Sequence, residues 1–178
     1  SYEEQVFNID EVRKRPGIKS AFGLDFGYTN DPTALFCGLV DKGSRCIYVF
    51  DELYERGLTN NKIAEKIVGM GYAKERIIAD AAEPKSIAEL REAGLYRIHP
   101  SRKGKDSINN GIQRIQDYHI IVHPRCVNFL MEISTYCWDR DKQTDQLINK
   151  PVDYNNHLMD AMRYAVMDAV RDDGFSFD

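Results

Sequence analysis

An acidic residue inside an apolar segment is the feature that most limits what this chain can fold into. Asp25 lies within the segment 18–26, whose side chains are mostly apolar, and Gly27 and the polar residues 29–31 follow it. An apolar run that ends in such a turn predicts a buried strand. An unpaired carboxylate is costly there, so the strand needs a partner group or a metal ion for it. The alternative is an aspartate that ends the strand and caps the turn.

The composition is that of a single globular domain. The chain has 178 residues, of which 43% are hydrophobic and 29% are charged, and this is enough for one domain with a proper core. The four cysteines form no CxxC pair, which favours reduced core thiols in a cytosolic protein. No apolar run reaches the length of a membrane span, and the first residues are not an apolar signal region, so we expect no membrane contact.

The order of the apolar patterns predicts an α/β fold. Segments 18–26, 33–40 and 45–53 predict three strands, and the short turns between them predict an antiparallel meander. Helical spacing then alternates with short apolar runs, which predicts helices near 60–70, 84–93, 108–115 and 127–134 and strands at 76–82, 96–99 and 120–122. A hairpin at 136–150 and a helix at about 154–170 complete the chain. We therefore expect a mixed sheet flanked by helices, in one domain from 18 to 178, with 1–17 as a lead-in.

Three acidic motifs follow one another along this pattern. They are Gly23-Leu24-Asp25-Phe26-Gly27, then Ile77-Ile78-Ala79-Asp80, and then His157-Leu158-Met159-Asp160-Ala161-Met162-Arg163-Tyr164-Ala165. From about residue 18 to residue 169 the chain resembles the nuclease domain of the large terminase subunit of tailed bacteriophages. The resemblance implies a ribonuclease H-like fold, in which acidic residues of the first strand, the fourth strand and a C-terminal helix meet at one edge of the sheet.

The resemblance also implies the roles of the site residues. Asp25 would be the central bridging metal ligand, Asp80 the second and Asp160 the third, with His157 as an auxiliary ligand or proton handler. Two divalent cations can activate water and stabilise the leaving oxygen in phosphodiester hydrolysis. Oxygen ligands suit Mg²⁺ or Mn²⁺, and an imidazole favours Mn²⁺. Helical periodicity disagrees with this role for Asp160. It places Asp160 roughly opposite the apolar face formed by Leu158, Met162, Ala165 and Ala169, and so in solvent.

The function implied is that of a metal-dependent DNA endonuclease that cuts concatemeric DNA during viral genome packaging. The implied partners are double-stranded DNA bound without sequence preference, the terminase small subunit and the portal of the procapsid, in the host cytoplasm and transiently at the portal. The chain contains no GxxxxGK[ST] motif, so the ATPase of the family would lie upstream. Residues 1–17 would then be a fragment of the linker to it.

Basic residues that could contact DNA phosphates gather after residue 100. They are Arg102, Lys103, Lys105 and Arg114. A flexible charged loop explains the same residues without any ligand. The net charge of -4 argues against a strong free-standing nucleic-acid binder but not against an enzyme that acts on nucleic acid.

Two other functions remain open at this point. One is a non-catalytic docking module of the packaging motor. The other is a phosphotransferase of the actin and sugar-kinase type, which also pairs a strand aspartate with glycine, although the chain is too short for its two lobes.

Further acidic and zinc-type residues have ordinary structural explanations. Asp31, Asp51, Glu52 and Glu83 could join the site, but turn, surface or helix-start positions explain each of them. His119, His123 and Cys126 suggest zinc only weakly, because no second cysteine pair is present, and an ordinary strand-end cluster is favoured.

Overall fold

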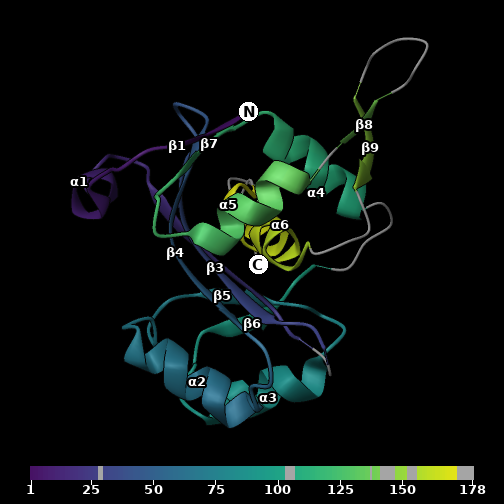
Figure 1. Cartoon of the computed structure of the whole chain (residues 1–178). Helices are drawn as coiled ribbons and strands as arrows, with labels where there is room; N and C mark the ends of the chain where they lie inside the picture. The colour runs from purple at the N-terminus through teal and green to yellow at the C-terminus, as the bar shows by residue number, and fades with distance from the viewer. Residues whose placement is uncertain (28–29, 103–106, 137, 141–146, 152–155, 172–178) are drawn as a thin grey trace, which may run out of the picture.

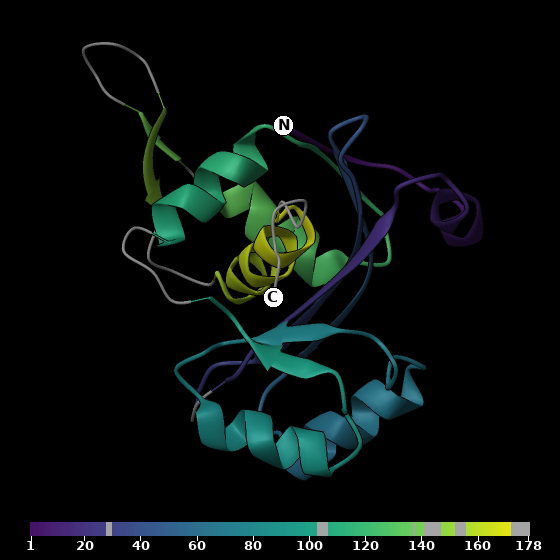
Figure 2. The ribbon, with the colours of Figure 1, turned by 180° about the vertical axis from the view of Figure 1, so that it is seen from behind.

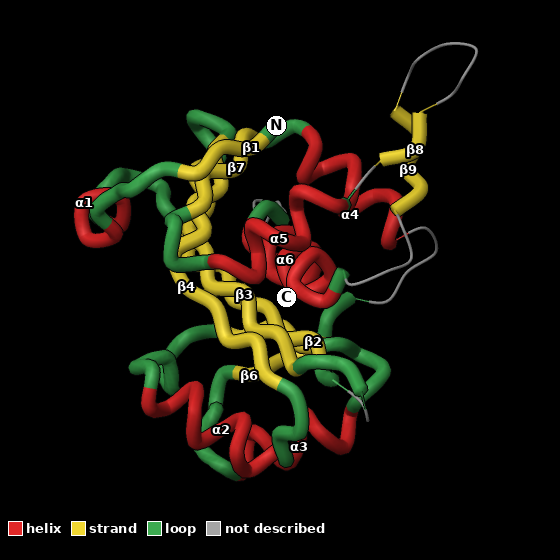
Figure 3. Tube along the Cα trace, in the orientation of Figure 1, coloured by secondary structure: helices red, strands yellow, loops and turns green. Residues whose placement is uncertain are grey.

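A mixed sheet of seven strands lies between two groups of helices (Figures 1 and 3). The computed structural model describes residues 1–27, 30–102, 107–136, 138–140, 147–151 and 156–171. The strands of the sheet are β1 (Tyr2–Glu4), β2 (Lys19–Asp25), β3 (Thr33–Asp41), β4 (Cys46–Glu55), β5 (Ile77–Ala79), β6 (Ile98–Pro100) and β7 (His119–Val122). The helices are α1 (Ile9–Arg13), α2 (Asn60–Gly69), α3 (Pro84–Glu92), α4 (Ser107–Gln116), α5 (Val127–Thr135) and α6 (His157–Ala169).

The sheet combines an antiparallel meander with parallel additions, as the sequence predicted. Its strand order is β1-β7-β4-β3-β2-β5-β6. The pairs β2–β3 and β3–β4 are antiparallel, whereas β2–β5, β5–β6, β4–β7 and β1–β7 are parallel. The strands β5, β6 and β7 each follow a helix, as parallel pairs need because a tight turn cannot join their strands, and β1 joins the sheet from the N-terminal end of the chain. The predicted mixed α/β sheet with flanking helices is confirmed.

Alternation along β2 divides the interior into two hydrophobic cores. Phe22 and Leu24 belong to the core that also holds the buried side chains of α2 and α3. Ala21 faces the other core, which is formed with α4, α5 and α6. Side chains two residues apart on a strand share a face, so Gly23 and Asp25 lie on the α6 side with Ala21. Asp25 therefore faces α6, the helix that packs on this side of the sheet (Figure 2).

The first seventeen residues contain two elements to which the sequence analysis assigned no structure. Tyr2 pairs with Ile120, so β1 is a parallel edge strand beside β7, and α1 follows it with Val12 buried. All three residues of β1 are exposed, so no apolar alternation marks the strand in the sequence. The linker role of residues 1–17 stays a prediction.

The helix predicted from Val127, Leu130, Met131 and Ser134 exists, but another face of it is buried. Phe129 and Glu132 are its buried residues, whereas Val127 and Met131 are 63% and 46% exposed. Contact with β4 and α6 selects that face. The predicted hairpin is present as β8 (Trp138–Arg140) and β9 (Leu147–Pro151), and β9 contacts α4. Within the described residues, no helix has both the length and the apolar character needed to span a bilayer.

Candidate metal centre

Two neighbouring parallel strands bring two of the predicted acids to the same edge of the sheet. Asp25 is the last residue of β2, and Asp80 comes directly after β5. Leu24 is in register with Ala79, and the Asp80 backbone N–H donates to the Leu24 carbonyl at 3.2 Å. The two carboxylates therefore begin from adjacent backbone positions.

A glycine in β2 lets helix α6 approach this edge. A Cβ atom at Gly23 would lie 1.8 Å from the carbonyl oxygen of Ala161, so no larger residue fits while α6 keeps its place. The helix thus packs with its backbone directly against β2 (Figure 2). His157 and Asp160 lie in the turn before Ala161, and Asp25 lies two residues beyond Gly23 on the same face.

His157 contacts Asp25 directly. Its Nδ1 lies 3.1 Å from Asp25 Oδ2, with 16% and 12% of the two side chains exposed. Its Nε2 lies 3.6 Å from Oδ1 of Asp31, an acid that we had explained as a turn residue. The hydrogen bond to Asp25 raises the pKa of His157, while burial acts against this shift. The imidazole is therefore held between two carboxylates.

Asp160 belongs to the same cluster. Burial, and after it the charge of Asp25, raise the pKa of Asp160 to about 6. Its Oδ1 accepts a hydrogen bond at 3.3 Å from Nη2 of Arg163, whose side chain is only 13% exposed. The expectation from helical periodicity, that Asp160 points into solvent, is wrong. The helix is covered by β2 on one side and by α4 and α5 on others, so its partly exposed edge faces the site.

The neighbouring charges act on Asp25 and on Tyr164. Burial raises the pKa of Asp25, and the charge of Asp80 adds to this, while the hydrogen bond from His157 opposes it. Burial and the charges of Asp25 and Asp80 raise the pKa of the Tyr164 phenol, which lies one helical turn beyond Asp160. These couplings indicate that Asp25, Asp80, His157 and Asp160 form one electrostatic cluster.

The donor chemistry of this cluster fits a divalent cation. Three carboxylates and an imidazole are hard or borderline ligands, and a cation would offset the burial and the repulsion that together raise the pKa values of Asp25 and Asp160. As placed, though, no three Asp, Glu, His or Cys side chains of the described residues converge into a group able to hold a metal ion. One oxygen of each carboxylate accepts a bond inside the protein: Asp25 from His157, Asp80 from the Ala82 N–H and Asp160 from Arg163. A cation would bind the second oxygen of each carboxylate or would replace these hydrogen bonds.

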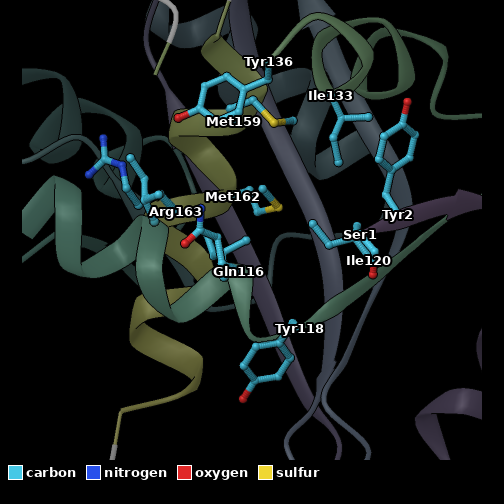
Figure 4. A pocket seen from close by; sticks show the side chains of 12 residues that line it. Ser1, Tyr2, Gln116, Tyr118, Ile120, Ile133, Tyr136, Met159, Met162 and Arg163 are labelled. Atoms are coloured by element: carbon cyan, nitrogen blue, oxygen red, sulfur yellow. The ribbon is translucent and has the colours of Figure 1, made fainter. Parts of the chain in front are cut away.

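A mostly apolar cavity lies beside α6 (Figure 4). Its volume is about 290 Å³, and it is lined by Ser1, Tyr2, Ile112, Ile115, Gln116, Tyr118, Ile120, Ile133, Tyr136, Met159, Met162 and Arg163. Its lining is mostly apolar, and no carboxylate is among these residues. We therefore assign the chemistry to the acidic cluster, not to this cavity. Arg163 borders both, and its side chain packs over Gly111 of α4.

The structure describes two of the four basic residues predicted to contact DNA. Arg102 and Arg114 are exposed. Arg102 and Tyr164 line one hollow. The Ala81 N–H, next to Asp80, donates to Ser101 Oγ, so Arg102 lies near the acidic cluster. Lys103 and Lys105 lie outside the described residues.

The other acids named in the sequence analysis have structural explanations. Asp51 accepts a hydrogen bond from the Tyr72 hydroxyl, and Glu52 accepts from the backbone N–H groups of Asn128 and Phe129 at the start of α5. Glu83 is the residue before α3, as a helix-start acid would be.

The residues of the weak zinc suggestion are divided among different contacts. His119 contacts Ser1 and Glu3, His123 contacts Arg125, and Cys126 is buried with Sγ against the Val49 carbonyl. The strand-end explanation accounts for all three.

The sequence analysis missed Arg163 and Glu132. Arg163 was only part of a motif, and its acidic partner is three residues away on the same helix. Glu132 is 1% exposed and binds the start of α6 from α5. A carboxylate on the buried face of a short apolar helix was the available signal.

The comparisons with known proteins agree with this geometry. A model of the terminase RNase H-like domain family matches residues 25–168. The terminase large subunit of Bacillus phage SPP1 is 36% identical over 166 residues, which are 92% of this chain and 39% of that protein. The PBSX phage terminase large subunit of Bacillus subtilis is 30% identical over 171 residues, again 92% and 39%. The chain thus spans about two fifths of the length of these relatives.

Solved structures show the same fold. The nuclease domain of the g2p large terminase of phage SPP1, determined with bound Mn, has a TM-score of 0.81 at 34% identity, over 94% of this chain and 95% of that one. The nuclease domain of the P22 large terminase has a TM-score of 0.63 at 17% identity, over 96% and 92%, and supports the fold alone.

Proposed function

This chain belongs to the family of terminase RNase H-like domains, and on that premise we propose that it is a DNA endonuclease domain that uses divalent cations. It would cut concatemeric double-stranded DNA as part of a terminase large subunit. The observation that supports this best is the contact of His157 with Asp25, at the edge where β2 and β5 end. The bound Mn of the similar SPP1 nuclease domain supports a divalent cation.

We assign the ligands by their positions. Asp25 would be the ligand shared by two cations, Mg²⁺ or Mn²⁺, because the other acids lie around it. Asp80 would be a second ligand, from the end of β5. Asp160 and His157 would be ligands from the start of α6. Divalent cations, when bound, polarise the phosphate and supply a hydroxide at neutral pH.

The protein's own groups would control protons and charge. The hydrogen bond between Nδ1 and Asp25 raises the pKa of His157, so the imidazole holds its proton more firmly than a free one. Its Nε2 atom faces Asp31 and could take or give a proton there. The charge of Arg163 lowers the pKa of Asp160 and of Asp25, so it opposes the protonation that burial favours at both carboxylates. Arg102, beside Tyr164, would hold a DNA phosphate, and Lys103, Lys105 and Arg114 would extend that contact without reading sequence.

The wider setting follows from the relatives. An ATPase domain upstream of residue 18, joined through 1–17, fits their greater length. The small subunit and the portal would be its partners, in the host cytoplasm and transiently at the procapsid. Family membership argues against the phosphotransferase alternative. The non-catalytic module remains the competing outcome of the following test.

The test is cleavage of supercoiled plasmid with Mg²⁺, with Mn²⁺ and with a chelator. The wild-type domain should cut only with metal, and Asp80→Asn should lower the rate by about 100-fold or more, because the amide keeps the shape of the side chain and loses its charge. Asp10→Asn, in the exposed first turn of α1, is the matched control and should cut normally. Circular dichroism checks that both variants fold. Near-normal cutting by Asp80→Asn would reject the metal-ligand role, and an inactive wild-type domain would favour the docking module.

A further inference from the structure

The helix that brings His157 and Asp160 to the site begins without a local cap. The first N–H groups of a helix have no acceptor within the helix. At α6, the residue in the capping position is Asn156, and in the described structure its side chain makes no cap hydrogen bond. Oε1 of Glu132, in α5, takes this place by accepting from the N–H groups of Leu158 at 2.8 Å and Met159 at 3.1 Å.

Glu132 is buried, so its contact with the start of α6 must offset a desolvation cost. The residue is 1% exposed. Burying a carboxylate is unfavourable unless hydrogen bonds and favourable charges compensate for it. Two backbone N–H groups and the positive end of the α6 dipole offset part of that cost at Oε1. Burial still raises the pKa of Glu132 to about 7, and its Oε2 has no hydrogen-bond partner among the described residues. The two N–H groups lie between His157 and Asp160 in the sequence, so the contact holds the backbone from which both side chains extend.

Glu132 also marks the end of its own helix. Its carbonyl accepts from the Tyr136 N–H at 2.8 Å, which closes α5. One residue therefore fixes the point where the chain leaves α5 and the point where it enters α6. The start of α6 is thereby tied to α5 independently of the chain between residues 137 and 155.

We propose that Glu132 is a positioning residue for the metal site, which sets the places of His157 and Asp160 relative to Asp25 by holding the first turn of α6. This rests on the proposed function, since it assumes that His157 and Asp160 act as ligands. It assigns no contact with the metal or with DNA to Glu132 itself.

The chain offers a matched control in Glu52. This strand residue caps α5 with the same chemistry, through the N–H groups of Asn128 at 3.1 Å and Phe129 at 2.9 Å. Its loss should also destabilise the fold, but it acts one helix further from the site. Glu52→Ala and Glu132→Ala therefore separate general stability from positioning.

The first measurement is hydrogen exchange at the Leu158 and Met159 amides in metal-free protein. Glu132→Ala should raise exchange there by about tenfold or more relative to Glu52→Ala, because only the first loses the acceptor. Glu132→Gln should retain protection, since its amide oxygen can accept both bonds. Unchanged protection in Glu132→Ala would overturn the inference, whatever the domain does to DNA.

The second measurement is Mn²⁺ affinity, from electron paramagnetic resonance of the free ion. Glu132→Ala should weaken binding by about tenfold or more, as loss of supporting residues around metal ligands does, whereas Glu52→Ala and Glu132→Gln should stay within about threefold. If Glu132→Ala does not fold, Glu132→Asp replaces it: its carboxylate is one methylene shorter, and a loss of about fivefold is expected. Equal weakening in the Glu52 and Glu132 alanine variants, or none in Glu132→Asp, would overturn the inference. Failure of the wild type to bind Mn²⁺ or to cut DNA would instead reject the proposed function, and the exchange data would still test the cap.

Discussion

At Asp25, burial and three neighbouring groups have opposite effects on one carboxylate. Burial and Asp80 disfavour its charge, whereas His157 and Arg163 favour it. On Asp160, the charge of Asp25 adds to the effect of burial, and Arg163 opposes both because it binds that carboxylate directly. A cation in the cluster would replace part of this compensation. Asp160 and His157 should therefore respond differently to the choice of metal.

We expect Asp160→Ala to lower the plasmid cleavage rate by about 100-fold in Mg²⁺ and to cost more than His157→Ala, since carboxylate oxygen suits Mg²⁺ better than imidazole nitrogen. In Mn²⁺ the two losses should become more similar, because Mn²⁺ accepts nitrogen more readily. Rates measured side by side in each metal decide this. If Asp160→Ala keeps normal rates in both metals, Asp160 is no ligand and its burial has a purely structural cause.

Individual residues differ in how well the sequence predicts their place. Asp25 and Asp80 were marked because each interrupts or ends an apolar strand, whereas their meeting at one sheet edge was predicted only by the resemblance to terminase nuclease domains. Glu132 could not be placed, because its partners are backbone groups of another helix, which no residue type in the sequence reveals. Asp31 had an adequate explanation as a turn residue, and only the path of α6 brings His157 near it.

At the scale of elements, the site depends on how closely α6 approaches β2. Helical periodicity misplaced Asp160 because it assumes one apolar face and one wet face, whereas α6 has sheet on one side and helices on others. The strand β1 escaped prediction for the opposite reason, since its exposed residues become a strand only through pairing with β7. The meander was predictable because β2, β3 and β4 are long, β2 and β3 are mostly buried, and the first half of β4 is buried.

Gly23→Ala tests the packing of α6 on β2. The added methyl would lie 1.8 Å from the Ala161 carbonyl oxygen, so the helix must move away. We expect the free energy of unfolding, from urea denaturation, to fall by about 3 kcal/mol, with loss of cleavage.

The control for this substitution is Gly69→Ala, at the end of α2. A Cβ atom there meets nothing within 4 Å, and the change should be neutral or should stabilise by up to about 1 kcal/mol. Stability of Gly23→Ala equal to that of the wild type would mean that α6 does not lie against β2 as described.

At the scale of the whole molecule, the protein is negatively charged, and the proposed site concentrates acidic residues at one edge of the sheet. The net charge is -4, and three of the acidic residues counted in it lie together at the proposed site, at one edge of the sheet. DNA, a polyanion, should therefore bind weakly, through a few basic side chains near that edge. Arg102 lies beside Tyr164, whereas Lys42 lies in the exposed turn between β3 and β4, at the opposite end of the strands.

We expect the domain to bind duplex DNA without sequence preference and with an affinity that falls steeply as salt rises, because each phosphate contact releases counterions. Binding is best measured in the Asp80→Asn background, where cutting does not interfere. Adding Arg102→Ala should reduce the slope of log affinity against log salt by about 1, the contribution of one phosphate contact, and Lys42→Ala should leave the slope unchanged. Two duplexes of unrelated sequence should bind within about threefold of each other, since phosphate contacts carry no sequence information. Sequence-specific binding that persists at high salt, or equal slopes for the Arg102 and Lys42 variants, would show that DNA approaches another surface.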